Sequence, residues 1–181
     1  VNVTKTVGIL FADELEYAPF KIFAAQKACT AFELHTMPAL RLSLAGGGHT
    51  LAVIAVECGL GKVNAAMAAA LLIGELKADF ILNAGLSGAV SGLGREDCVA
   101  GESYMECDFD LTAIGLPLGK KPGVYGPYPA DPLLLRLALQ QADVVAAKLG
   151  TGDLFLADTQ RKELYKKLFG IQAFDMESAA I

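Results

Sequence analysis

Short apolar runs alternate along the chain with longer stretches whose apolar residues recur at helical spacing, and glycines or acidic residues separate them. This alternation is typical of an α/β fold, in which buried strands are followed by helices that cover a sheet. The predicted strands are residues 5–12, 32–36, 40–44, 51–56, 80–82, 97–104, 144–149 and 171–176. The predicted helices are residues 13–26, 63–76, 132–142 and 159–169, with a last helix starting at Glu177.

The stretch Ala78–Val90 (ADFILNAGLSGAV) predicts the strand and turn around which the chain is organised. Phe80–Leu82 is an unbroken apolar run, which favours a strand buried on both faces of a parallel or mixed sheet. Gly85 and Gly88 follow, so the backbone can bend sharply and a ligand can approach its amides closely. Ligands of open α/β sheets bind at the carboxyl ends of strands. The turn is therefore either a ligand site or a plain strand-to-loop connection.

Proline and glycine interrupt the regular pattern in three places. Pro19 lies inside the first predicted helix, so we expect that helix to start late or to kink. Residues 45–50 (AGGGHT) predict a hairpin-like turn between two strands. Residues 116–130 are rich in glycine and proline, which predicts a long loop without regular structure. Long loops in compact domains often serve as lids or subunit contacts.

Composition narrows the classes of function. The 181 residues are 54% hydrophobic, which is enough for the core of a single domain. The longest apolar run, Ala65–Ile73, is too short to span a bilayer. The net charge is −5 and no basic stripe is clustered, which argues against nucleic acid or an anionic membrane as the partner.

Cysteine and histidine are too sparse for a metal site or a disulfide framework. His35 and His49 have no cysteine or second histidine nearby in the sequence, so we expect no metal and no cofactor. Widely spaced cysteines without a C-x-x-C pair fit reduced thiols in a cytoplasmic enzyme. The cysteines are Cys29, Cys58, Cys98 and Cys107.

Acidic residues form two groups with candidate chemistry. Asp13, Glu14 and Glu16 suit the positive end of a helix dipole, but one of them could also point over the sheet edge that carries the Gly85 turn. Glu14 and Glu16 fall on different helix faces, and the spacing favours Glu16 as the one that looks inward. Asp108 and Asp110 share one face of an extended segment, where they bind a divalent ion or hydrogen-bond nearby backbone; we favour the structural role.

Two nucleotide-binding motifs are excluded by their spacing. The GLGK sequence at residues 59–62 lacks the spacing of a phosphate-binding loop and the serine or threonine that should follow the lysine. No G-x-G-x-x-G occurs near the Gly85 turn, which disfavours a dinucleotide-binding fold. The alanines of residues 65–70 suit a helix that packs closely on a sheet.

Six motifs together resemble the nucleoside phosphorylase and nucleosidase superfamily, and within it the 5′-methylthioadenosine/S-adenosylhomocysteine nucleosidases. They are GILFADELEYAP (8–19), CGLGKVNAA (58–66), DFILNAGLSGAV (79–90), DFDLTAIG (108–115), TGDLF (151–155) and AFDMESAAI (173–181). The resemblance implies a mixed, twisted central sheet flanked by helices, in a homodimer. It also implies a small-molecule purine nucleoside as substrate, with cleavage of the bond between adenine and a 5′-modified ribose.

Site residues carry over from the resemblance by position. Glu16 matches the carboxylate that orients and deprotonates the attacking water, and Glu177 matches the one that grips the ribose hydroxyls. Phe155 would stack on the purine, and Leu156 would hold it through its backbone. The remaining matches surround the sugar: Met176 beneath it, and Leu86, Ser87 and Gly88 in the loop beside the ribose and the water.

The resemblance favours hydrolysis, with alternatives. Phosphorylases of this superfamily hold phosphate with arginines, and the matching segments FADELE and NAGLSG contain none, so we expect water as the nucleophile. The resemblance places an aspartate general acid in a strand past Ile181. A last helix of one turn without a C-cap also predicts that residues 1–181 form one domain lacking its C-terminal strand and helix.

Three alternatives stay open. They are a phosphorylase of the same fold, a hydrolase of another nucleoside such as futalosine or 5′-deoxyadenosine, and a non-catalytic nucleoside-binding remnant.

Overall fold

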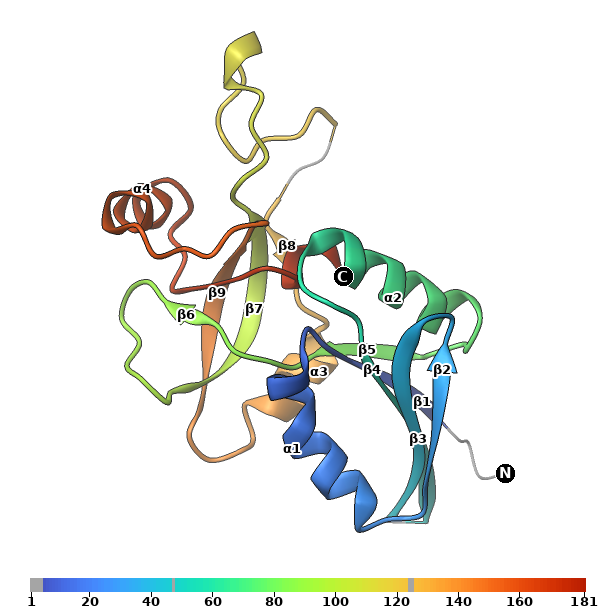
Figure 1. The fold of residues 1–181 in the computed structure, drawn as a ribbon. Coiled ribbons are helices and arrows are strands. Elements are labelled where there is room, and N and C mark those ends of the chain that lie inside the picture. Colours follow the sequence, from blue (N-terminus) through green and yellow to red (C-terminus); the bar gives the residue numbers. More distant parts are fainter. Residues whose placement is uncertain (1–4, 47, 124–125) are drawn as a thin grey trace. The chain divides into compact units, whose positions relative to one another are not determined.

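Strand pairing divides the chain into two five-stranded sheets, each in a compact unit of its own (Figure 1). The computed structural model describes residues 5–46, 48–123 and 126–181. The first unit runs through Leu86 and also contains Ala180 and Ile181, and the second is Ser87–Ala179.

The sheet of the first unit is mixed, with strand order β2-β3-β4-β1-β5. The strand β1 lies between β4 and β5 and runs parallel to both, while β2, β3 and β4 pair antiparallel. Leu10 lies opposite Asn83, so the carboxyl ends of β1 and β5 meet at one edge. The bounds are β1 Lys5–Phe11, β2 Cys29–Leu34, β3 Met37–Gly46, β4 His49–Glu57 and β5 Phe80–Asn83.

Two helices cover opposite faces of this sheet (Figure 1). The helix α2 (Lys62–Gly74) buries Ala68 and Leu72 against Leu10 and its neighbours on one face. The helix α1 (Glu14–Ala25) buries Tyr17 against Phe11 on the other face. Successive residues of β1 therefore point to opposite helices, as strand geometry requires. This burial on both faces explains the unbroken apolar run of β1. The prediction that Phe80–Leu82 is buried on both faces is wrong, because this strand is partly buried and Leu82 is 37% exposed.

The sheet of the second unit is also mixed, with order β6-β10-β9-β7-β8. The central strands β7, β9 and β10 run parallel, and the two-residue strands β6 and β8 pair antiparallel at the edges. The strands are β6 Gly88–Ala89, β7 Cys98–Glu106, β8 Tyr128–Pro129, β9 Val144–Thr151 and β10 Ala173–Asp175; the helices are α3 Pro132–Ala138 and α4 Thr159–Phe169, with 3₁₀ turns η1 Thr112–Ile114 and η2 Ser178–Ala180.

Aromatic packing and capping place α4 beside the sheet of the second unit. Tyr165 of α4 stacks on Phe174 of β10 with ring centroids 5.8 Å apart. The helix begins where the Asp158 carboxylate accepts a hydrogen bond from the Arg161 N–H and ends at Gly170 in the left-handed conformation. α3 has the same kind of N-cap at Asp131.

The predicted α/β fold of mixed sheets flanked by helices is confirmed, with corrections of detail. The expected central sheet is two sheets, because the local pattern of a strand does not encode its partner. The helix α1 does not start late: it begins at Glu14 and runs through Pro19, since the Asp13 cap and the burial of Tyr17 outweigh the missing N–H. Whether the chain is one domain remains a prediction.

Two further predictions need correction. The predicted loop 116–130 contains the edge strand β8, although residues 124–125 lie outside the described part. At the other end, Glu177 precedes only a short 3₁₀ turn and no α-helix.

The predicted turn at 45–50 joins the antiparallel strands β3 and β4, and Gly47 lies outside the described residues. No helix in the described ranges has the length and apolar character needed to cross a membrane.

The buried thiol of Cys107 should resist modification. Burial raises its pKa to about 12, so the thiol stays protonated in the folded protein at pH 8, whereas Cys98 is exposed. We expect mapped labelling with a thiol reagent at pH 8 to modify Cys98 promptly and Cys107 only after unfolding. The raised pKa also means that the contribution of this group to stability is lost as the pH rises above its ordinary value of 9.0. Equal labelling rates at the two cysteines in the folded protein would contradict this assignment.

Candidate active site

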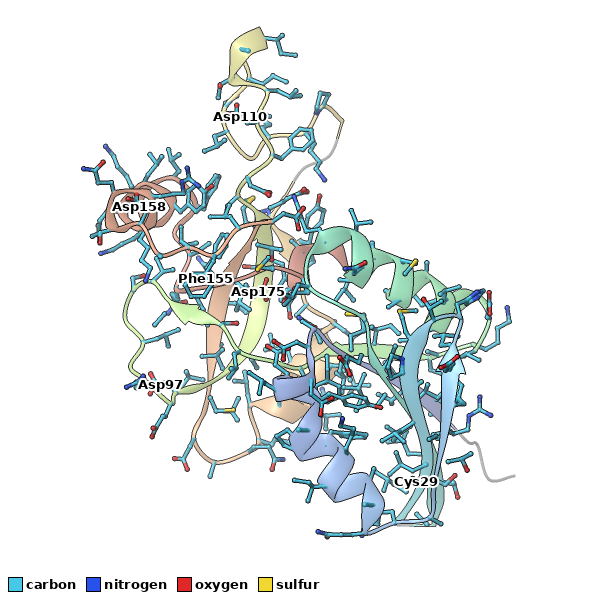
Figure 2. The ribbon with its side chains drawn as sticks, viewed as in Figure 1. Cys29, Asp97, Asp110, Phe155, Asp158 and Asp175 are labelled. Atoms are coloured by element: carbon cyan, nitrogen blue, oxygen red, sulfur yellow. The ribbon has the colours of Figure 1, made fainter. Side chains whose placement is uncertain are left out.

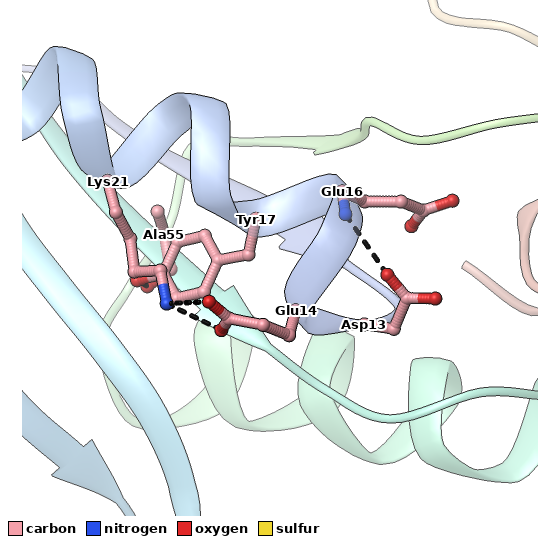
Figure 3. Close-up of polar contacts among 6 residues, drawn as sticks. All are labelled: Asp13, Glu14, Glu16, Tyr17, Lys21 and Ala55. Atoms are coloured by element: carbon pink, nitrogen blue, oxygen red, sulfur yellow. Dashed lines mark hydrogen bonds and ion pairs between the residues drawn. The ribbon is translucent and has the colours of Figure 1, made fainter.

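The first unit fixes Glu16 where β1 and β5 end. Asp13 caps α1 by accepting a hydrogen bond from the Glu16 N–H at 3.0 Å, which starts the helix directly after β1 (Figure 3). The Glu16 carboxylate then bends back over the strand ends. Its Oε2 accepts from the Ala12 N–H at 3.0 Å, and its Oε1 accepts from the Leu86 N–H at 2.7 Å. Both oxygens are oriented by backbone amides, and each keeps lone-pair capacity for a further donor.

Glu14 serves a different purpose from Glu16. It points toward Lys21, and the Nζ–Oε1 distance is 2.6 Å, while Glu16 points the other way (Figure 3). The sequence-based choice of Glu16 as the acid facing the Gly85 turn is therefore confirmed. Leu86 joins it through the backbone, while its side chain is exposed, so the side chain at this position is not needed for the hydrogen bond.

Gly85 is required by the close approach of Glu16. A Cβ atom at this position would lie 2.5 Å from both carboxylate oxygens of Glu16. No side chain fits there without displacing the acid. The glycine turn is therefore shaped around a carboxylate, and that Ala78–Val90 also binds a ligand remains a prediction.

Buried polar residues mark the strand ends of the second unit. Among the described residues the buried polar side chains are Glu106, Thr151, Asp175 and Glu177. Thr151 ends β9, Asp175 ends β10 and Glu177 follows two residues later. Polar groups are buried with hydrogen-bond partners, and ionisable side chains are rarely buried unless they are paired. The carboxyl ends of β9 and β10 are thus the second candidate region.

Asp175 organises the turn that carries Glu177. Its Oδ1 accepts from the Thr151 hydroxyl at 2.7 Å and from the N–H groups of Glu177 and Ser178 at 3.3 and 3.2 Å. Its Oδ2 accepts from the Ser178 hydroxyl. Thr151 Oγ1 in turn accepts from the Ala179 N–H at 3.0 Å. The Glu177 carboxylate folds back to accept from the Met176 N–H at 3.1 Å.

The TGDLF segment leaves β9 beside this turn and presents Phe155. The Gly152 N–H donates to the Asp175 carbonyl at 3.2 Å, and the Asp153 N–H donates to Asp108 Oδ2 at 2.8 Å. Phe155 is 89% exposed, whereas Leu156 is buried in the core. Figure 2 shows Phe155 and Asp175 in this part of the second unit. An exposed phenyl ring on an anchored turn is a surface for stacking a planar ligand.

The paired aspartates have the structural role that the sequence favoured. Asp108 anchors the TGDLF turn, and Asp110 accepts from the Thr112 N–H at 2.8 Å. Hydrogen bonds from Thr112 hold the pKa of Asp110 below its usual range. In the ranges that the structure describes, no group of histidine, cysteine, aspartate or glutamate could hold a metal ion.

The remaining predicted residues divide between the two units. Glu16 and Leu86 belong to the first unit. In the second, Gly88 of β6 pairs with Phe174 of β10, two residues before Met176, and Ser87 precedes it. Each unit brings its own residues together; that they share one ligand remains a prediction. The sequence analysis missed Thr151 and Asp175. Asp175 could have been found, because an aspartate two or three residues before a helical turn is a recognisable N-cap signal.

Comparison with known proteins gives these features a family. A family model described as the phosphorylase superfamily matches residues 6–181. The chain belongs to the phosphorylase superfamily. Its resemblance to the nucleosidases of that superfamily is confirmed by curated relatives. The 5′-methylthioadenosine/S-adenosylhomocysteine nucleosidase of Geobacillus sp. (strain WCH70) is 37% identical over 137 residues, which cover 71% of this chain and 59% of the relative.

Two solved structures share the fold. The 5′-methylthioadenosine/S-adenosylhomocysteine nucleosidase of Neisseria meningitidis, in complex with methylthio-immucillin-A, superposes with a TM-score of 0.84 at 29% identity, covering 97% of this chain and 77% of that one. The futalosine hydrolase of Helicobacter pylori superposes with a TM-score of 0.87 at 22% identity, covering 97% and 76%. The chain of this superfamily member therefore spans 59% of a curated relative and about three quarters of these solved chains.

A methyl group at Gly85 should disturb the Glu16 cradle. We expect Gly85→Ala to lower the free energy of unfolding by about 1–3 kcal/mol, because the new Cβ must displace the carboxylate or the turn. Gly74→Ala is the matched control: this site at the end of α2 has open space, and the change should leave stability unchanged or raise it by up to about 1 kcal/mol. Urea unfolding of both variants measures the difference. Equal effects at the two positions would show that the Glu16 carboxylate does not occupy this place.

Proposed function

We propose that this protein hydrolyses the N-glycosidic bond of 5′-modified adenine nucleosides, of which 5′-methylthioadenosine and S-adenosylhomocysteine are the expected substrates. The observation that carries the proposal is the Glu16 carboxylate, fixed by the Ala12 and Leu86 amides at the carboxyl ends of two parallel strands. The nucleosidase relatives support it, although the chain covers only part of their length.

Glu16 is suited to the role of general base. Cleavage of the bond builds positive charge on the sugar and negative charge on the departing base, so a nearby carboxylate stabilises the first and activates the nucleophile. The two amides hold the carboxylate in one orientation while leaving an oxygen lone pair for a water hydrogen. A base that is already oriented spends no further entropy on positioning during the reaction.

The second unit is suited to holding the nucleoside. Glu177 follows the end of β10 and would accept hydrogen bonds from the ribose hydroxyls, with Met176 beneath the sugar. Phe155 offers an exposed ring for the purine, and the backbone of Leu156 lies next in the chain, with a side chain anchored in the core. Ser87 and Gly88 would line the ribose from the segment beside β10. These roles rest on the resemblance, and the local geometry is compatible with each of them.

Water rather than phosphate is the proposed nucleophile. Phosphate needs cationic or bidentate donors such as arginine, and Arg41 is the one arginine in residues 1–86. It lies on β3, and its guanidinium sits over the Phe32 ring of β2 at 5.2 Å from the centroid. In the sheet, β4 separates β3 from β1, and β5 lies beyond β1, so this arginine is remote from the Glu16 cradle.

Replacing Glu16 should separate catalysis from binding. We expect Glu16→Gln, in the full-length gene product, to lower kcat for adenine release from methylthioadenosine by about 10²- to 10⁴-fold while nucleoside binding stays largely intact. Glu14→Gln is the matched control, because Glu14 pairs with Lys21 on another face of the same helix turn and should leave kcat unchanged.

The same assay distinguishes the competing functions. Adenine release should proceed without phosphate, and a strict phosphate requirement would make the protein a phosphorylase. Turnover of futalosine or 5′-deoxyadenosine in place of methylthioadenosine would assign another substrate to the same site. If no nucleoside is turned over although adenosine still binds, the protein is a nucleoside-binding remnant. Unchanged kcat in Glu16→Gln would rule out Glu16 as the base.

We also propose a homodimer, supported by the uncharged outer face of α2. Val63, Ala66, Met67, Ala70 and Ile73 are exposed and recur at helical spacing. A contiguous apolar stripe with small residues is suited to close packing against a second copy of the same helix.

A charge in this stripe should dissociate the dimer. We expect Met67→Glu to shift the sedimentation-equilibrium mass from dimer toward monomer, because the carboxylate would be buried without a partner. Leu164→Glu on α4 is the matched control, since Leu164 and Met67 are equally exposed at 46%, and should leave the mass unchanged. A monomeric wild type would refute the homodimer.

A further inference from the structure

We propose that Thr151 and Asp175 are positioning residues that hold the ribose-binding and purine-binding segments in register; the inference rests on the proposed function. The Thr151 hydroxyl donates to Asp175 Oδ1 at 2.7 Å, and this contact joins residues from the ends of two neighbouring strands. Thr151 has no exposed surface and Asp175 is 7% exposed, so neither side chain can fill the role of a surface contact.

The network closes on both strands. From Thr151, the chain continues into the TGDLF turn that carries Phe155. From Asp175, it continues into the turn that carries Glu177, and the Asp175 carboxylate caps that turn by accepting from the Glu177 and Ser178 amides. Thr151 Oγ1 also accepts from the Ala179 N–H, so one hydroxyl links the start of the TGDLF turn to both ends of the other turn.

A backbone contact ties the two turns a second time. The Gly152 N–H donates to the Asp175 carbonyl at 3.2 Å, next to the side-chain link. A shift of Thr151 would therefore move the anchor of Phe155 and that of Glu177 together. Hydrogen bonds to a buried carboxylate are strong, and removing the Thr151 hydroxyl takes away the one of these bonds that ties Asp175 Oδ1 to β9. The Asp175 carboxylate thus sets where the Glu177 carboxylate stands relative to the end of β9.

This arrangement predicts a defect in sugar recognition and not merely in stability. A purely structural cap would change the melting temperature and leave the preference for ribose hydroxyls as it was. A positioning role would lower that preference, because a displaced Glu177 no longer meets the hydroxyls. The discriminating quantity is the ratio of the dissociation constant for 2′,3′-dideoxyadenosine to that for adenosine.

The test is calorimetric titration of the two nucleosides into full-length protein that carries Glu16→Gln, so that neither is turned over. We expect Thr151→Val, which removes the hydroxyl at constant volume, to lower the ratio by roughly tenfold to a hundredfold. Thr151→Ser, which keeps a hydroxyl at this position, should retain most of the wild-type ratio. Asp175→Asn is the second variant if Thr151→Val does not fold, and should also lower the ratio. Ser91→Ala is the control, since it deletes another hydroxyl bond of the second unit, to the Ile171 carbonyl.

Each outcome decides the inference. A wild-type ratio retained in both Thr151→Val and Asp175→Asn, with only the melting temperature lowered, overturns it while the proposed function stands. Adding Glu177→Ala to Thr151→Val should lower the ratio no further, and additive losses would show that Thr151 does not act through Glu177. If the protein with intact Thr151 and Asp175 does not prefer adenosine to 2′,3′-dideoxyadenosine, or binds neither nucleoside, the proposed function fails, and this inference fails with it.

Discussion

Backbone amides at the carboxyl ends of parallel strands hold the acids on which the candidate site depends. Where such a strand ends, the chain turns away from the sheet and its N–H groups need new acceptors. Glu16 accepts from Ala12 and Leu86, and Asp175 accepts from Glu177 and Ser178. The need to satisfy the amides and the need to orient a carboxylate are met by the same bonds. This is a physical reason why chemistry gathers at this edge of α/β sheets.

Close approach sets which residues can stand near those acids. Gly85 admits Glu16 because it has no Cβ, and Gly8 admits the side chains of Leu72 and Ile81, which a Cβ would meet at 2.9 Å. Because Gly8 has no side chain, α2 can pack close to the face of β1. Because Gly85 has none, the Glu16 carboxylate can reach the end of β5. The close packing of α2 on the sheet and the approach of Glu16 to β5 therefore both depend on a glycine at the point of contact.

Much of the fold follows from the local pattern of apolar and polar residues. The rest depends on contacts between distant segments, which this local pattern does not determine. The apolar run that became β1 could be predicted because both of its faces are buried. The run that became β5 is recognisable as a strand, but it is only partly buried. Glu16 could be chosen over Glu14 because helix spacing separates their directions. Thr151 and Asp175 lie 24 residues apart, and only the parallel pairing of β9 with β10 brings them together. The division of the strands between two sheets likewise depends on pairing partners and not on any single run.

The two regions differ in what fixes their acids. Glu16 is held by donors within the first unit, and Glu177 stands on a turn whose bonds lie within the second. A hydrogen bond that orients the Glu16 carboxylate joins segments 70 residues apart in the sequence, whereas the bond to the Glu177 carboxylate is local to its own turn. Glu16 therefore depends on the pairing of β1 with β5, and Glu177 depends on the cap that Asp175 supplies.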